Sequence, residues 1–422
     1  MINEHAGSGR QITIIGGGII GLCSALELQA AGLRVDLIDP QQEREAASYG
    51  NAGIIAVSEN QPLSTPAMLR QLPRLLLDPG SPVALRLSHL PAFIPWGWRF
   101  FRSAGADHVQ HSARALASLI QQAVPSFRKL LADTEGLPRL QQKGWLKVYS
   151  TKKGLAAGHR EQQAALGSGA VAQALGPDDI KQLEPNLAPM AGAVFYPECA
   201  QIDDLPGLLK HLTEVFLQRG GRLHQTRALA LKMTEQGPEA VITASGTLPC
   251  QQLLICAGAW SKRWAKELGC PLPLDTERGY HLMLPRSNNR LLQRPVFWSE
   301  RAMVLNPLSQ GLRLSSGVEF AGLKAKPDYA KITRLAGLAA QLLPDVDARI
   351  EDRWLGFRPS MPDSVPVISR SPKFDNSFFA FGHGHLGLTL GPITGRLIRE
   401  IICNQDSSID VAPFAATRFS SF

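Results

Sequence analysis

The feature that most constrains the fold of this chain is a glycine-rich turn near its start. Residues 12–15 are Ile-Thr-Ile-Ile, Gly16, Gly17 and Gly18 follow, and residues 19–31 carry apolar side chains at helical spacing. This order predicts a buried strand, a tight turn and a helix. Residues 35–39 predict a second strand, which completes a βαβ unit. The charged residue Glu27 and five glycines argue against a membrane-spanning helix over residues 12–33.

The glycines follow the spacing Gly16-x-Gly18-x-x-Gly21, which is typical of dinucleotide-binding turns. The first glycine permits the turn, the second lets the backbone approach a pyrophosphate, and the third lets helix and strand pack closely. The helix N-terminus offers free N–H groups to the anion, and Asp39 can accept a hydrogen bond from a ribose hydroxyl. We therefore expect dinucleotide contacts from Gly16, Gly18, Ile19, Ile20, Gly21 and Asp39.

The identity of the dinucleotide is only partly constrained by these residues. An acid at the ribose position disfavours a 2′-phosphate, so NADP is the least expected ligand. FAD and NAD both remain open, and a glycine turn in an unrelated α/β core is the alternative to a dinucleotide site.

The rest of the chain predicts a second kind of sheet. With 422 residues, two or three structural units are expected. A strand at 378–381, a glycine-rich turn and a helix from about Pro392 repeat the order of the first unit, which indicates a nucleotide domain assembled from distant segments. Residues 61–141 are mostly helical in pattern. Strand-like runs occur at 144–150, 222–233, 240–244 and 253–256, and the edges of an antiparallel sheet are expected at 280–284, 302–305 and 312–316.

Composition and charge set broad limits on function. The hydrophobic fraction is 44% and the charged fraction 19%, as in soluble globular proteins. A net charge of +8 favours anionic partners such as phosphates, acidic substrates or lipid headgroups, and we expect no nucleic-acid partner. Six scattered cysteines without a C-x-x-C pair predict neither a disulfide scaffold nor a metal site. The first ten residues lack an apolar stretch, so a cytoplasmic location is expected.

Residues 70–102 combine basic and aromatic side chains. Five arginines and one acid, Asp78, accompany the run Phe93-Ile94-Pro95-Trp96-Gly97-Trp98-Arg99-Phe100-Phe101. Such a segment suits peripheral contact with an anionic membrane, although nine residues cannot span a bilayer. The alternative is that these helices cover the substrate-binding domain.

Four further motifs carry a resemblance to a known family. They are Ala47-Ser48-Tyr49-Gly50-Asn51-Ala52-Gly53, Cys256-Ala257-Gly258-Ala259-Trp260-Ser261, Trp354-Leu355-Gly356-Phe357-Arg358-Pro359-Ser360-Met361-Pro362-Asp363 and Gly382-His383-Gly384-His385-Leu386-Gly387-Leu388-Thr389. In this order they resemble the D-amino-acid dehydrogenase branch of the FAD-dependent amine oxidoreductases, whose wider family includes glycine oxidase, sarcosine oxidase and D-amino-acid oxidase. The last motif most resembles members that act on D-hydroxyproline or D-proline.

The resemblance implies an α/β plus α+β fold with two interleaved domains. A Rossmann-like FAD-binding domain is expected from residues 11–60, 175–265 and 350–412. A substrate-binding domain with an antiparallel sheet flanked by helices is expected from residues 61–174 and 266–349. Residues 1–10 and 413–422 are expected to be tails.

The resemblance also implies roles for individual residues. Arg358 would hold the substrate carboxylate, since a guanidinium makes two parallel charge-assisted hydrogen bonds with it. Tyr280 or His281 would contact the substrate, although strand alternation lets only one of them face inward; structural packing is the alternative for both. His383 and His385 are expected to pack against cofactor or substrate, and an influence of His385 on substrate preference is the alternative. Further FAD contacts are expected from Ser48, Asn51, Gly53, Gly258, Gly384, Gly387, Leu388 and Thr389.

The implied activity is oxidative deamination of a D-amino acid, with hydride transfer from Cα to noncovalent FAD. Ser360 and Met361 stand where covalent-flavin relatives have a cysteine shortly after the arginine. The electrons would pass to a quinone or a protein acceptor, and partner subunits remain open. The alternatives are a glycine- or sarcosine-type oxidase that uses oxygen, a non-catalytic flavoprotein subunit, and an NAD-linked dehydrogenase.

Overall fold

The structure is a computed structural model that describes residues 9–41, 46–78 and 81–419. One of its two large sheets has six strands in the order β10-β2-β1-β14-β21-β20. The first five run parallel, and β20 is antiparallel to β21. These strands are β10 (Arg222–His224), β2 (Arg34–Ile38), β1 (Gln11–Ile15), β14 (Gln252–Ile255), β21 (Ser377–Phe381) and β20 (Val367–Arg370).

The first and last strand-turn-helix units lie side by side in this sheet, as expected from their matching patterns. Strand β14 separates β1 from β21, and helices α1 (Ile19–Ala30) and α11 (Gly387–Ile402) pack against each other. Glycines in α11 permit a close approach, because a Cβ on Gly395 would lie 2.7 Å from the backbone of Cys23. The expected start of the last helix is wrong: α11 begins at Gly387, and Pro392 lies inside it rather than in its first turn. The buried contacts of α11 with α1 stabilise the helix despite the missing N–H.

The second large sheet has nine strands and is mainly antiparallel. Its order is β19-β15-β18-β17-β16-β6-β8-β7, and β4 pairs with β18. The segments expected at its edge are interior strands, because β15, β18 and β17 each have neighbours on both sides. The strands are β19 (Asp352–Ser360), β15 (Asp275–Leu284), β18 (Gly311–Phe320), β17 (Met303–Leu308), β16 (Val296–Trp298), β6 (Trp145–Tyr149), β8 (Gly192–Tyr196), β7 (Gln173–Leu175) and β4 (Val83–Leu85).

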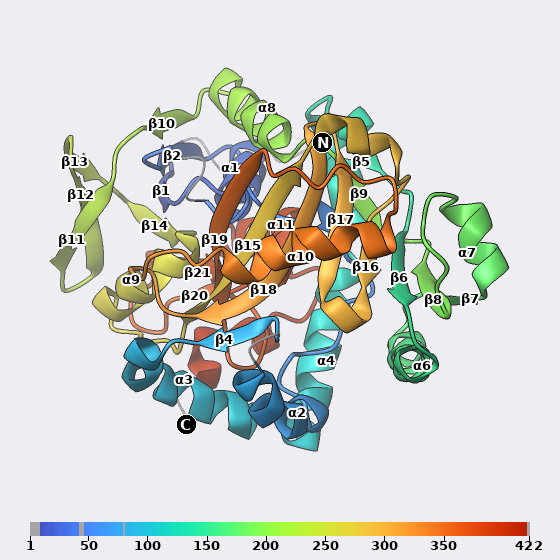
Figure 1. The fold of residues 1–422 in the computed structure, drawn as a ribbon. Helices are drawn as coiled ribbons and strands as arrows, with labels where there is room; N and C mark the ends of the chain where they lie inside the picture. The colour runs from blue at the N-terminus through green and yellow to red at the C-terminus, as the bar shows by residue number, and fades with distance from the viewer. Residues whose placement is uncertain (1–8, 42–45, 79–80, 420–422) are drawn as a thin grey trace.

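The chain passes repeatedly between the two large sheets (Figure 1). Strands β8 and β19 fall wholly within the ranges expected for the FAD-binding domain, yet they pair in the nine-stranded sheet. The strand expected over residues 222–233 is two strands in two sheets: β10, and β11 (Ala228–Thr234), which pairs with β12 (Gly237–Thr243). Strand β13 (Gly246–Pro249) completes that small sheet. A second small sheet contains β3 (Ile54–Ile55), β9 (Ala200–Ile202) and β5 (Leu140–Gln141).

The helices cover the sheets. Helices α4, α5 and α8 lie near α1 and α11, whereas α10 packs on β15 and β18. Their bounds are α4 (Ala106–Ile120), α5 (Ala123–Asp133), α8 (Leu205–Gln218) and α10 (Ala330–Leu342), and the remaining α-helices are α6 (Lys152–Gly167), α7 (Pro177–Leu183) and α9 (Ser261–Glu267).

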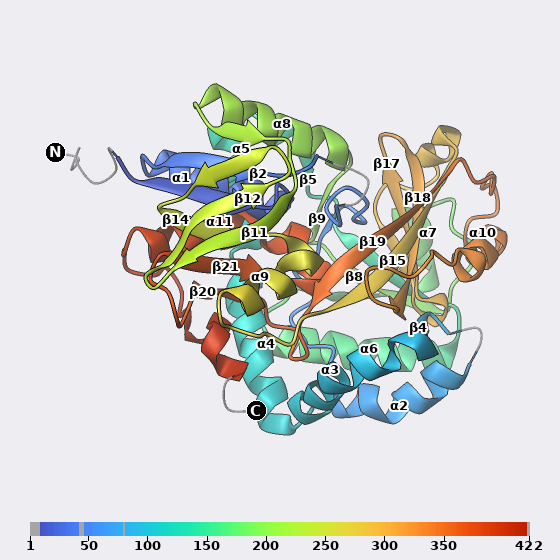
Figure 2. The ribbon, with the colours of Figure 1, turned by 90° about the vertical axis from the view of Figure 1, so that its left-hand side faces the viewer.

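Helices α2 (Pro66–Leu77) and α3 (Leu90–Ser103) lie beside β4 at one end of the molecule (Figures 1 and 2). One face of α3 packs on the nine-stranded sheet through Trp96, whose Nε1 donates to the backbone oxygen of Ser360 at 3.1 Å. Its other face is exposed at Ile94, Trp98 and Phe101. None of the helices in the described part of the chain has both the length and the hydropathy needed to cross a bilayer.

Candidate active site

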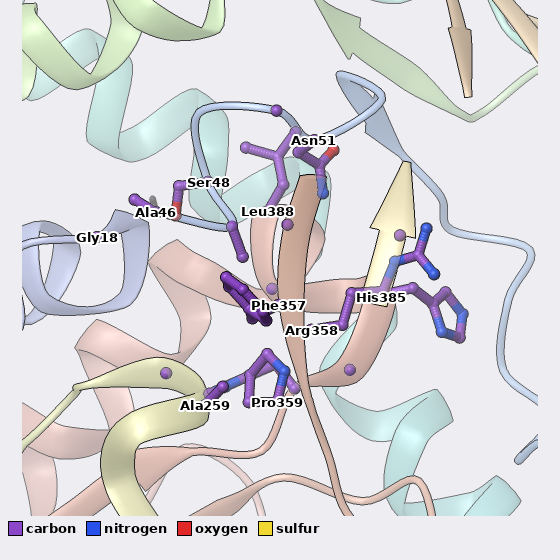
Figure 3. A pocket seen from close by; sticks show the side chains of 18 of the residues that line it. Gly18, Ala46, Ser48, Asn51, Ala259, Phe357, Arg358, Pro359, His385 and Leu388 are labelled. Atoms are coloured by element: carbon purple, nitrogen blue, oxygen red, sulfur yellow. The ribbon is translucent and has the colours of Figure 1, made fainter. Parts of the chain in front are cut away.

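A cavity of about 580 Å³ is lined by residues from both large sheets. At one end lie the β1–α1 turn and the end of β2, and at the other lie residues of β15, β18 and β19. Figure 3 shows Gly18 and Ser48 at one side of this space and Arg358 and His385 at the other. The cavity therefore joins the glycine turn to Arg358 and His385.

The glycine turn has the geometry that a dinucleotide requires. Gly16 has a φ of +108°, and a Cβ there would overlap the backbone of Cys256, the residue after β14. Gly18 is the N-cap of α1, and the nearest atom to a Cβ built on it would be Ser48 Oγ at 3.2 Å. The start of the helix is thus open to a close approach by an anion. Gly16, Gly18, Ile19, Ile20 and Asp39 line the cavity.

Two side chains organise this turn. The backbone N–H of Gly17 donates to Asp39 Oδ2 at 2.6 Å, and that of Ile19 donates to Ser48 Oγ at 3.0 Å. Gly21 does not line the cavity; a Cβ there would collide with the backbone oxygen of Gly16, so its place is the contact between helix and strand.

The loop after β2 contributes Ser48 and Asn51 to the cavity wall. Asn51 Oδ1 accepts a hydrogen bond from Gly53 N–H at 2.9 Å. Gly53 itself lies outside the cavity lining, with a φ of +80°, and a Cβ on it would approach the backbone oxygen of Ile202 to 2.6 Å. Gly53 therefore supports the loop from behind.

Arg358 lies in β19 and reaches the cavity from the edge of the nine-stranded sheet. Its Nη1 donates to the backbone oxygen of Gly317 at 3.0 Å. Burial lowers the pKa of Arg358, and the carboxylate of Glu277 on the neighbouring strand opposes that shift. Figure 3 shows Phe357 on the other side of β19, as strand alternation requires. The guanidinium remains a cation in a partly dehydrated space, where a carboxylate would pair with it strongly.

The two histidines of the last motif have different surroundings. His385 lines the cavity beside Arg358 (Figure 3). Burial lowers the pKa of His385 and Arg358 acts in the same direction, against the opposing effect of Glu59 and Glu277. His383 also lines the cavity, but its Nε2 lies 2.9 Å from Thr394 Oγ1 of α11, and burial lowers its pKa to about 3. Both imidazoles are therefore neutral near pH 7.

Of the neighbours Tyr280 and His281, it is Tyr280 that lines the cavity. Its hydroxyl donates to Glu319 Oε2 and accepts from Asp328 N–H at 3.2 Å. Burial raises the pKa of Tyr280 to about 12. His281 faces the other way and stacks on Trp354, with ring centroids 4.9 Å apart.

Some of the expected FAD contacts around the start of α11 line the cavity, and one does not. Gly384, Gly387 and Leu388 line the cavity, as does Gly258 after β14. Thr389 does not; its Oγ1 accepts from Ala56 N–H at 3.1 Å and so joins α11 to the segment after β3.

A further group of residues on the cavity wall belongs to none of the sequence motifs. Glu59, Trp145 and Phe297 line the cavity, and Lys147 pairs with Glu59 at 2.7 Å. Trp145 and Lys147 lie in a run that was identified only as a strand. A charged residue inside that otherwise apolar run was the available signal, because a buried lysine needs a partner. Across the described ranges, no group of three or more His, Cys, Asp or Glu could hold a metal ion.

Comparisons with known proteins agree with this geometry. Residues 11–401 match the family model described as DAO, FAD dependent oxidoreductase. A protein of Bradyrhizobium diazoefficiens named D-amino-acid oxidase is 34% identical over 97% of this chain and 99% of its own length. D-amino acid dehydrogenase 2 of Mesorhizobium japonicum is 26% identical over 95% of this chain and 98% of its own. The crystal structure of glycine oxidase from Geobacillus kaustophilus has a TM-score of 0.72, with 24% identity, over 97% of this chain and 99% of its own.

The match confirms the mixed fold, the family and FAD as the dinucleotide. The residues alone had allowed either FAD or NAD. Together with the glycine turn on the cavity wall, the match shows that this chain belongs to the DAO family of FAD-dependent oxidoreductases.

Proposed function

We propose that this protein is a D-amino-acid dehydrogenase that deaminates its substrate oxidatively. The observation that carries the proposal is the position of Arg358, a half-buried cation on the wall of the cavity that begins at the glycine turn. The names of the relatives in Bradyrhizobium and Mesorhizobium support a D-amino acid as the substrate.

In this proposal the half of the molecule around the six-stranded sheet holds most of the FAD. Gly16 and Gly18 would lie against the pyrophosphate, Asp39 would accept from the ribose, and Ser48 and Asn51 would border the path toward the substrate. Gly258, Gly384, Gly387 and Leu388 would line the flavin end. The half around the nine-stranded sheet would hold the substrate. Each proposed domain is thus defined by the large sheet it contains and not by continuous ranges of residues.

Bound FAD would supply the oxidant, which accepts a hydride from the substrate Cα. Arg358 would hold the substrate carboxylate with two parallel hydrogen bonds and thereby orient Cα. The neutral imidazole of His385 adds no positive charge beside the amine, which must be unprotonated to react. The resulting imine would hydrolyse in water to an oxo acid, or persist as a cyclic imine if the substrate is a proline.

For the finer points we propose D-hydroxyproline or D-proline as the preferred substrate and a quinone or a protein as the electron acceptor. An acceptor in a membrane would suit the exposed face of α2 and α3, which we name the α2–α3 face and define by Leu77, Leu87, Ile94, Trp98 and Phe101. Leu77 and Leu87 are 82% and 83% exposed, and Arg70, Arg74 and Arg102 are exposed nearby. Exposed apolar side chains beside arginines favour contact with anionic lipid.

An anaerobic screen tests the proposal. The purified flavoprotein would be mixed with D- and L-amino acids, including the hydroxyproline epimers, and the flavin absorbance recorded. Bleaching by D-amino acids is expected. A flavin that no D-amino acid reduces would contradict the proposal. Hydrogen peroxide formed at the rate of substrate consumption in air would instead indicate an oxidase.

A further inference from the structure

An ion pair lies in the wall of the cavity, outside the set of residues assigned above to FAD and to the substrate carboxylate. Lys147 of β6 donates to Glu59 Oε1, with Nζ and the oxygen 2.7 Å apart. The side chain of Lys147 is 11% exposed and that of Glu59 is 26% exposed. Glu59 lines the cavity, so the acid is the member of the pair that a ligand can reach.

Aromatic rings confine the lysine. Its Nζ lies 4.7 Å from the ring centroid of Trp145, 5.4 Å from that of Tyr196 and 6.0 Å from that of Phe297. Rings at these distances stabilise the cation and limit its movement. Lys147 therefore holds Glu59 from behind.

The pair keeps Glu59 ionised. Burial alone would raise the pKa of Glu59, but the attraction to Lys147 outweighs it and the pKa is lowered. An ionised carboxylate has several acceptor positions. Within the described ranges only Oε1 of Glu59 takes part in a side-chain hydrogen bond, which leaves Oε2 able to accept another.

Glu59, Arg358 and His385 line the same cavity. The negative charge of Glu59 opposes the lowering of the pKa of His385, whereas the positive charge of Arg358 adds to it. Arg358 and His385 are neighbours in Figure 3. A substrate whose carboxylate pairs with Arg358 would therefore share the cavity with the carboxylate of Glu59.

We propose that Glu59, held by Lys147, is a specificity-determining residue that accepts a hydrogen bond from the substrate side chain. The enzyme would then prefer amino acids whose side chain ends in a hydroxyl or amine over apolar counterparts of similar size. This inference rests on the proposed function, because it takes Arg358 as the partner of the carboxylate.

Matched substrate pairs test the inference. Anaerobic stopped-flow reduction of the flavin would be followed with 4-hydroxy-D-proline and D-proline, D-serine and D-alanine, and D-lysine and D-norleucine. Each substrate gives an apparent Kd and a limiting rate of reduction. We expect at least one donor-bearing member to bind about tenfold or more tightly than its counterpart. This affinity ratio corresponds to the contribution of one hydrogen bond to a charged group. The hydroxyl and amine pairs distinguish a neutral donor from a cationic one.

Three variants test the residue itself. Glu59→Ala is expected to abolish the preference by raising the Kd of the donor-bearing substrate alone. Glu59→Gln keeps the size of the side chain, is expected to weaken the preference several-fold, and replaces the alanine variant if that one misfolds. Glu161→Gln is the matched control: Glu161 also interacts with Lys147, but it is exposed on α6 and does not line the cavity. Flavin content and melting temperature report folding.

The outcomes separate the two proposals. Loss of the preference in the Glu59 variants, with Glu161→Gln unchanged, supports the inference. The inference is overturned if the wild type binds both members of every pair equally, or if the preference survives in both Glu59 variants. In either case the proposed function stands as long as D-amino acids still reduce the flavin. If no D-amino acid reduces the flavin, the proposed function itself fails.

Discussion

The guanidinium of Arg358 lies directly over Gly279 of the neighbouring strand, in space that a Cβ on Gly279 would fill. Gly279 has no left-handed backbone conformation that would require glycine. Its missing side chain therefore makes room for the arginine. A substitution of Gly279 can thus test the position of Arg358 without replacing the arginine.

Gly279→Ala is expected to displace the guanidinium without unfolding the protein, since the clashing atoms are the end of a long side chain. A small displacement of a positioning group lowers kcat/KM by about ten- to a hundredfold. Steady-state kinetics with an artificial dye as acceptor would measure it. Gly337→Ala is the matched control, because a Cβ at this helical glycine meets nothing within 4 Å. Equal kinetics in the two variants would contradict the assigned position.

Arg358→Ala and Arg358→Lys should raise the apparent KM while FAD content stays normal. Loss of one partner of a partly buried charge pair lowers kcat/KM by about a hundredfold. The lysine variant keeps the charge but loses the bidentate geometry, so only partial recovery is expected. Kinetics and flavin absorbance measured on the same preparation check both points. Unchanged kinetics would remove the assignment.

His383 should make stability depend on acid pH. Its pKa is lowered to about 3 by burial, against about 6.5 in an unfolded chain. Because the folded state binds the proton more weakly, the stabilisation is complete above about pH 6.5 and is lost as the pH falls toward 3. Between pH 7 and pH 5 this amounts to about 2 kcal/mol.

His383→Gln removes the titration and keeps a polar group near Thr394 Oγ1. Urea unfolding at pH 7 and pH 5 would measure the free energy of unfolding of the wild type and of the variant. The stability difference between wild type and variant should shrink at pH 5. A difference that is independent of pH would show that the imidazole is not buried as the structure has it.

FAD should be released by acid precipitation. The cysteine on the cavity wall is Cys256, which is buried, and burial raises the pKa of its thiol. A protonated thiol is a poor nucleophile. The yellow colour is expected in the supernatant after centrifugation, and colour that stays in the denatured pellet would mean a covalent link.

The α2–α3 face should bind anionic vesicles. Phosphatidylglycerol vesicles are expected to sediment with the wild type at low salt and less well at high salt. Replacing Leu87 and Trp98 by serine should abolish binding, whereas Leu217→Ser should not, since Leu217 is exposed on α8, far from this face (Figure 1). Equal sedimentation of the two variants would count against the membrane contact.

The local pattern of the sequence was enough for the β1–α1 turn. Gly16, Gly18 and Asp39 act within one βαβ unit, so their spacing along the chain already determines their spacing in the fold. The matching unit at β21 and α11 was predictable for the same reason. Within this unit the expected start of α11 was wrong, because packing against α1 outweighs the local cost of Pro392.

The tertiary structure decided which side chains share a site. Glu59 and Lys147 are distant in sequence, and they meet because β6 and the segment after β3 border the same cavity. The choice of Tyr280 over His281 for the cavity wall depended on which face of β15 is turned inward. Gly21, Gly53 and Thr389 carry the expected motifs but lie behind the wall, because a motif specifies the residues of a turn and only packing specifies which of them a ligand can reach.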